Sequence, residues 1–181
     1  MRIERLLLTC LLAAGLPASA RPPGSTALER LAELSAQRLQ LADRVAASKR
    51  RSGKPVEDPA RESDQLQRLG EAAVARGLPR EAATGFFRAQ FEANKLIQYR
   101  LLGEPPRRGE AAADLDAIRA QLNRLNEQLL DALGPGLGEA TGADCTARSR
   151  QARERAARRQ RLDELHRIAL SRAFGDLCRR P

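Results

Sequence analysis

Apolar residues recur every three or four positions along most of this 181-residue chain, which is the spacing of amphipathic α-helices. No stretch of the sequence alternates apolar and polar residues as a half-buried strand does. Clusters of glycine and proline interrupt the helical pattern. The predicted helices are 26–51, 59–77, 79–102, 111–133 and 146–177. The pattern predicts an all-α fold, a bundle of about five to six helices.

The first predicted helix carries two cations on an otherwise apolar face. Arg38 and Lys49 are separated by eleven positions, which at about 100° per residue places them within roughly 20° of each other and about 16 Å apart along the axis. Only small residues, Ala42 and Val45 among them, lie between them on this face. Such a face is expected to be buried, although Arg38 could snorkel to the helix edge and Lys49 lies near a helix end.

The third predicted helix repeats this feature with amides. Asn94 and Gln98 share a face with Phe87 and Phe91, and buried amides need hydrogen-bond partners. The two amides could bond each other or a neighbouring backbone group, or they could face a ligand.

Further polar groups point to the same interior. Arg119 lies at the margin of the apolar stripe of the fourth predicted helix, and Asp58, Arg61 and Glu62 lie at the start of the second. Burying unpaired ions costs several kcal/mol each, and only Asp58 and Glu62 offer nearby carboxylates. The excess of cations and amide donors therefore favours a dianionic ligand.

The first twenty residues have the pattern of a cleaved secretory signal peptide. Two arginines precede an apolar run over 6–16, and the triplet Ala18-Ser19-Ala20 follows. The apolar run is too short to span a bilayer. We expect cleavage of 1–20, a periplasmic or secreted mature chain over 21–181 that forms a single domain, and no membrane association after cleavage.

The mature chain would keep two cysteines, Cys145 and Cys178. In an oxidising compartment they favour a disulfide over two free thiols, and closing a loop of about 34 residues would contribute roughly 3 to 4 kcal/mol. The chain has a net charge of +9, much of it in an arginine-rich C-terminal segment. Only 3% of the residues of the chain are aromatic, and Phe174 is the one aromatic residue of this segment, so it fits a solvated helix face better than a nucleic-acid-binding surface.

The combination of Arg38, Lys49, "PVEDPARE" at 55–62 and "FFRAQFEANKLIQ" at 86–98 resembles the all-helical chorismate mutases. The signal peptide, the C-terminal cysteine pair and the extra length resemble their secreted (gamma) subclass. The resemblance covers about 28–178. It implies one helical domain with its active site in the bundle interior, a core over about 26–133 and a C-terminal helical extension over 145–178.

The resemblance implies an isomerase that converts chorismate to prephenate by an intramolecular [3,3] rearrangement, in the branch leading to phenylalanine and tyrosine. It implies no cofactor and no metal, and a homodimer with each active site built within one chain. The catalytic residues would be Arg38, Lys49 and Gln98. The implied carboxylate ligands are Arg38, Arg61, Asn94 and Arg119, the groups near the ring hydroxyl are Asp58 and Glu62, and the donors to the ether oxygen are Lys49 and Gln98, with Lys49 also near a carboxylate.

Two other functions are compatible with the residues. A non-catalytic exported helical protein could bind small dicarboxylates with the same cations, but such a protein has no need of Lys49 and Gln98 as paired donors. A nucleic-acid-binding protein would use the basic C-terminal segment and would bind with a steep salt dependence.

Overall fold

The computed structural model describes residues 25–106, 114–175 and 177–178. The predicted signal peptide over 1–20 and positions 111–113 of the fourth predicted helix lie outside the described residues. All regular elements within the described residues are α-helices, which confirms the predicted fold class. They are α1 Ala27–Ser52, α2 Pro59–Val74, α3 Arg80–Leu102, α4 Leu115–Glu139, α5 Cys145–Arg159 and α6 Glu164–Ala173.

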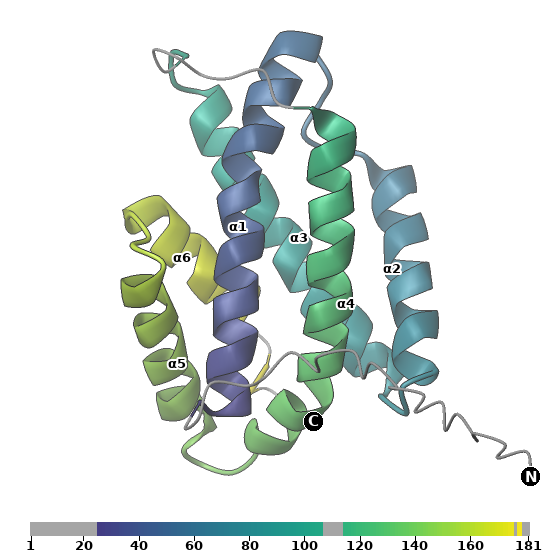
Figure 1. The fold of residues 1–181 in the computed structure, drawn as a ribbon, viewed down its shortest axis with the longest axis vertical. Helices are drawn as coiled ribbons and strands as arrows, with labels where there is room; N and C mark the ends of the chain where they lie inside the picture. Colours follow the sequence, from purple (N-terminus) through teal and green to yellow (C-terminus); the bar gives the residue numbers. More distant parts are fainter. Residues whose placement is uncertain (1–24, 107–113, 176, 179–181) are drawn as a thin grey trace, which may run out of the picture.

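Helix α1 is the centre of the bundle. It packs against α3, α4, α5 and α6, while α2 packs against α3 and α4 (Figure 1). Because neighbours cover it on several sides, α1 buries Leu28, Leu31, Leu34 and Leu39 almost completely. Within the described residues, none of the helices is both long and apolar enough to cross a bilayer.

Local signals place the ends of the helices that carry the predicted site. Thr26 caps α1 by accepting a hydrogen bond from the Glu29 amide, and Gly53 ends the helix in a left-handed conformation with φ 67°. Asp58 caps α2 by accepting from the Arg61 amide at 3.3 Å, and Pro59 occupies the first helical position. The sequence predicted all of these boundaries to within two residues.

Helix α4 is longer than the sequence predicted. The segment 134–139 was expected to be a loop because Pro135 lies between two glycines, but it continues the helix to Glu139. Two contacts with α1 explain the extension. Gly136 lies so close to α1 that a Cβ there would be 2.2 Å from Leu31 Cδ1, and the Glu139 carboxylate accepts hydrogen bonds from the first two amides of α1 at 2.8 and 2.9 Å. These contacts with α1 offset part of the cost of proline in α4.

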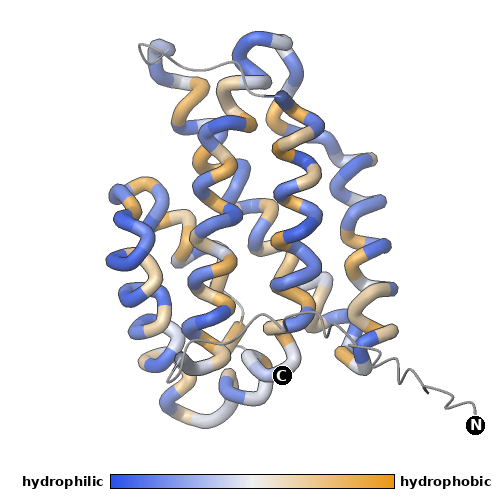
Figure 2. The backbone as a smooth tube through the Cα atoms, viewed as in Figure 1, coloured by the Kyte–Doolittle hydropathy of each residue, from blue (hydrophilic) through white to orange (hydrophobic). Residues whose placement is uncertain are grey.

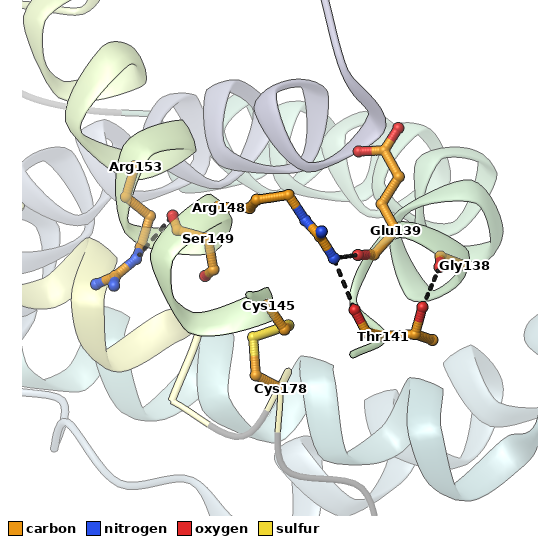
Figure 3. The surroundings of a disulfide bond; sticks show 8 residues. All are labelled: Gly138, Glu139, Thr141, Cys145, Arg148, Ser149, Arg153 and Cys178. Atoms are coloured by element: carbon orange, nitrogen blue, oxygen red, sulfur yellow. Dashed lines mark hydrogen bonds between the residues drawn. A yellow bond between two sulfur atoms is a disulfide. The ribbon is translucent and has the colours of Figure 1, made fainter. Parts of the chain in front are cut away.

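The predicted helix over 146–177 is two helices, and the prediction of one is wrong. The chain reverses at 160–163, where Arg161 has φ 51°, and Asp163 then caps α6. A continuous helix of this length would be about 48 Å long, whereas the Cα atoms of Cys145 and Cys178 are 5.7 Å apart. The reversal is what allows the predicted disulfide, which the structure contains (Figure 3).

The arginines of α5 have structural partners. The helix is largely hydrophilic (Figure 2), and its buried residues are small, with Ala152 and Ala156 among them. Arg155 pairs with the buried Glu29 of α1, and Arg159 pairs with Glu33. Near the disulfide, Arg148 donates to the backbone carbonyls of Glu139, at the end of α4, and of Thr141, in the loop that follows (Figure 3). Part of the basic C-terminal segment therefore docks α5 on the bundle.

The single histidine joins α6 to α1. His166 is 6% exposed, with Nδ1 2.7 Å from Asp163 Oδ1 and Nε2 3.1 Å from Asp43 Oδ1. The neighbouring Asp43 carboxylate raises the pKa of His166, burial opposes this increase, and Asp163 adds to it.

Candidate active site

One cavity of about 370 Å³ contains every residue proposed from the sequence as substrate-binding. Its walls come from α1, α2, α3, α4 and the α1–α2 connection. The proposed residues that line it are Arg38, Lys49, Asp58, Arg61, Glu62, Asn94, Gln98 and Arg119. A second cavity of about 390 Å³ lies beside the start of α1, but its charged groups are engaged with one another and with backbone atoms, as described for Glu139 and Arg148.

Arg38 is the most deeply buried cation of the site, at 4% exposure. Its Nε donates to Asn126 Oδ1 at 3.1 Å, its Nη1 donates to the Gln90 carbonyl at 3.2 Å, and its guanidinium lies 5.2 Å from the centre of the Phe91 ring. Burial lowers the pKa of Arg38 to about 10, which corresponds to a penalty on the charged form of about 3 kcal/mol. Arg38 remains protonated at neutral pH.

Lys49 is half-buried at the other end of the same face. Its Nζ donates to the Val56 carbonyl at 2.8 Å, so the α1–α2 connection holds the ammonium at the cavity wall. Burial lowers the pKa of Lys49, and the negative charges of Asp58, Glu62 and Glu57 oppose that change. The ammonium is therefore partly desolvated and has nearby but not directly bonded carboxylates.

Asn94 and Gln98 bond each other, as one interpretation of the sequence expected. Gln98 Nε2 donates to Asn94 Oδ1 at 2.6 Å. The pair is nevertheless incompletely satisfied, because Asn94 Nδ2 and Gln98 Oε1 are buried without a hydrogen-bond partner. Unpaired buried polar atoms are uncommon, and here both belong to side chains that line the cavity. The arrangement favours a polar ligand.

The two proposed carboxylates have partners within the protein. The Asp58 carboxylate caps α2. Glu62 Oε2 lies 3.2 Å from the Nζ of Lys95, which also pairs with Glu57 at 3.0 Å and Glu92 at 2.7 Å. Burial alone would lower the pKa of Lys95, but the hydrogen bonds to Glu92, Glu57 and Glu62 outweigh it and raise the pKa.

Two further arginines lie nearer to solvent. Arg61 is exposed, and Arg119 is partly exposed with Nη1 3.0 Å from Asp116 Oδ1. The cations of the cavity are therefore arranged at different depths, with Arg38 innermost. The cationic side chains that line the cavity are Arg38, Lys49, Lys54, Arg61, Lys95 and Arg119. The anionic ones are Glu57, Asp58 and Glu62. The excess of three positive charges suits an anion with two carboxylates.

Sequence reasoning missed Asn126 and Lys95. Asn126 is eight residues after Ile118 and therefore lies on the apolar stripe of α4, which was a usable signal for a buried polar group. Lys95 follows Asn94 directly, and nothing in the spacing indicated that three carboxylates would surround it. In the part of the chain that the structure covers, no group of three or more His, Cys, Asp or Glu side chains is placed to hold a metal ion.

Comparison with known proteins defines the class. The family model for type II chorismate mutases matches residues 29–99. Over 166 residues the chain is 31% identical to a secreted chorismate mutase of Mycobacterium tuberculosis, with 90% of this chain and 83% of the relative covered. The chain therefore belongs to the chorismate mutase family and is an isomerase of that kind. The word "secreted" in the relative's name agrees with the export predicted for this chain.

Solved structures give the same result. A chorismate mutase from Burkholderia phymatum has a TM-score of 0.79 at 35% identity, with 85% of this chain and 97% of that chain covered. A chorismate mutase from Burkholderia thailandensis also has a TM-score of 0.79, at 32% identity, with 85% and 100% covered. The helical bundle of this chain is thus the chorismate mutase fold over nearly the whole length of these relatives.

Proposed function

We propose that this protein, after export and removal of residues 1–20, converts chorismate to prephenate in the cavity between α1, α2, α3 and α4. One observation carries the proposal. One cavity brings together four polar side chains that have incomplete partners. The buried Arg38 guanidinium has no carboxylate partner among the described residues, and the Lys49 ammonium is held at the cavity wall. The Asn94 and Gln98 amides are incompletely hydrogen-bonded.

The reaction breaks an ether C–O bond and forms a C–C bond within one molecule, so it needs neither a nucleophile nor a proton transfer. The protein has to select the compact conformer of the substrate and stabilise the negative charge that grows on the ether oxygen. In this proposal Arg38 binds one carboxylate from the cavity floor, and Arg61 and Arg119 bind the other from its mouth. Arginine suits this role because its forked donors match a carboxylate.

Lys49 and Gln98 act on the ether oxygen in this proposal. Lys49 supplies a partly desolvated positive charge. A concerted half-turn of the Asn94 and Gln98 amides preserves their mutual hydrogen bond and turns the Gln98 Nε2 group into a free donor. Glu62 accepts a hydrogen bond from the ring hydroxyl, and Asp58, whose carboxylate caps α2, contributes through its backbone.

The magnitudes are sufficient. A millionfold acceleration requires about 8 kcal/mol, and one preorganised donor in a water-excluded site contributes about 3 to 4 kcal/mol. Two such donors together with conformer selection reach the required value. A non-catalytic binder of small dicarboxylates would use the same three arginines but would have no need of the Lys49 ammonium at the other end of the α1 face.

The test follows the loss of chorismate absorbance by the oxidised protein, with prephenate identified as the product. Removing the charge by Lys49→Ala should lower kcat at least about 100-fold. Arg51→Ala is the matched control, because Arg51 is an exposed cation on the same helix that does not line the cavity, and its kcat should stay within twofold. Absence of turnover by folded wild-type protein would refute the enzyme and leave the binder.

We also propose a homodimer whose active sites are each complete within one chain. Arg119 and the seven other proposed residues line one cavity of a single chain, which supports sites complete within one chain, whereas the dimer rests on the resemblance to the family alone. Light scattering should give twice the chain mass, and the specific activity should not fall when dilution separates the subunits. A monomeric mass contradicts the dimer, and a fall in activity contradicts self-contained sites.

A further inference from the structure

The guanidinium of Arg38 is held entirely by groups that carry no formal charge. Within the described residues its polar contacts are the Asn126 amide oxygen, the Gln90 backbone carbonyl and the face of the Phe91 ring. Both hydrogen bonds use Nε and Nη1, and the Nη2 group makes no hydrogen bond to any described residue. Arg38 lines the cavity, so Nη2 is left for a ligand there.

This arrangement is unusual for a buried cation. A charge removed from water is ordinarily compensated by a carboxylate, because an unpaired one is costly. Asn126 occupies the place that such a carboxylate would take. Its Oδ1 lies 3.1 Å from Arg38 Nε, its side chain is 5% exposed, and it comes from the facing helix α4. Asparagine and aspartate have nearly the same shape, so the neutral side chain is not required by space.

We propose that Asn126 is a positioning residue that orients Arg38 without neutralising it, so that the positive charge stays available to a carboxylate of the ligand. The inference rests on the proposed function, which it extends to a residue outside the cavity lining. A resident aspartate would offer the same hydrogen bond and would compete with the ligand for the charge. The neutral amide fixes the geometry and leaves the electrostatic attraction to the ligand.

The second acceptor is positioned by the rest of the bundle. The carbonyl that receives Arg38 Nη1 belongs to Gln90, whose side chain is fully buried and donates to Ser35 Oγ at 3.0 Å and to the Ala173 carbonyl at 3.3 Å. These bonds connect α3 to α1 and to the end of α6. The Arg38 site is therefore preorganised before a ligand enters, with α4 and α3 each providing one neutral acceptor.

Two substitutions separate positioning from ordinary packing. Asn126→Asp keeps the shape and the acceptor but adds a negative charge beside the buried cation. It should raise the Tm of the ligand-free protein, because Arg38 gains a counterion, and raise the KM for chorismate at least tenfold, because the ligand loses part of its attraction. Asn126→Leu removes the acceptor, and should lower the Tm and also raise the KM at least tenfold.

Asn123→Asp is the matched control. It adds the same charge to the same helix, but at an exposed position that does not line the cavity. Its KM should stay within twofold of wild type, which shows that net charge alone does not weaken binding. A higher Tm combined with a higher KM in Asn126→Asp supports the inference, because a residue that only packs would not move the two quantities in these directions.

Asn126→Asp with an unchanged KM, or with a Tm below that of wild type, would overturn the inference. The Tm measurement uses no substrate, so the inference and the proposed function can fail separately. If wild type does not act on chorismate and Asn126→Asp has a higher Tm, the proposed function is wrong, but the conclusion that Arg38 lacks a counterion in the ligand-free protein is supported. If wild type is active and Asn126→Asp binds chorismate normally, only the inference fails.

Discussion

Removal of the Cys145–Cys178 disulfide should destabilise the protein without altering its chemistry. The two cysteines are 33 positions apart in the sequence, and cross-linking a loop of that length lowers the chain entropy of the unfolded state by an amount worth about 3.7 kcal/mol at 25 °C. Cys145 lies at the start of α5 and Cys178 follows α6, so the bond closes the segment that covers α1 and α3. Neither cysteine lines the candidate active-site cavity.

The assay compares wild type with the double variant Cys145→Ala/Cys178→Ala by calorimetry. For a domain of this size, 1 kcal/mol corresponds to about 2 to 4 °C in Tm, so a decrease of about 10 °C is expected. Wild type measured with a thiol reductant is the control for the substitutions themselves and should show a similar decrease. At 25 °C, where both proteins remain folded, kcat/KM for chorismate should agree within twofold.

A decrease in Tm of less than about 3 °C would refute this reasoning, because it would mean that the unfolded chain is hardly constrained by the bond. A large loss of kcat/KM in a folded double variant would refute the second part. It would show that the α5–α6 segment shapes the cavity and does not merely cover the bundle.

Two other features of the fold give independent predictions. Gly136→Ala should lower the Tm, because the new Cβ would lie 2.2 Å from the buried Leu31 Cδ1 and overpacking costs about 1 to 3 kcal/mol. Gly138→Ala is the control and should leave the Tm unchanged, because no atom lies within 4 Å of the position of its Cβ. Equal decreases in Tm for the two variants would contradict the close approach of Gly136 to α1. The pKa of His166 is raised from 6.5 by the Asp43 carboxylate, 3.1 Å from Nε2, so its stabilisation is present below about pH 6.5 and is lost as pH rises through the folded-state pKa. The Tm advantage of wild type over His166→Gln should therefore shrink between pH 6 and 9, and an advantage that grows with pH contradicts the assignment.

Much of the candidate site could be predicted because its residues occupy helix faces whose direction follows from spacing alone. Arg38 and Lys49 share a face of α1 through eleven-residue spacing, and Asn94 and Gln98 share one through a four-residue spacing. These faces of α1 and α3 are otherwise apolar and are buried in the bundle, so their polar groups point toward a common interior. The prediction of a common polar interior therefore follows from helical geometry and from the cost of burying charge.

The sequence by itself determined the helical class, both ends of α1, the start of α2 and the cysteine pair, because each depends on neighbouring residues or on composition. Only the tertiary structure decided that α4 continues through Pro135, since the reason lies in α1, more than a hundred residues away. It also decided the reversal of the chain at 160–163 and the hydrogen bond from Arg38 to the uncharged Asn126 side chain. Those features depend on which side chains meet across helices, and no local pattern encodes that information.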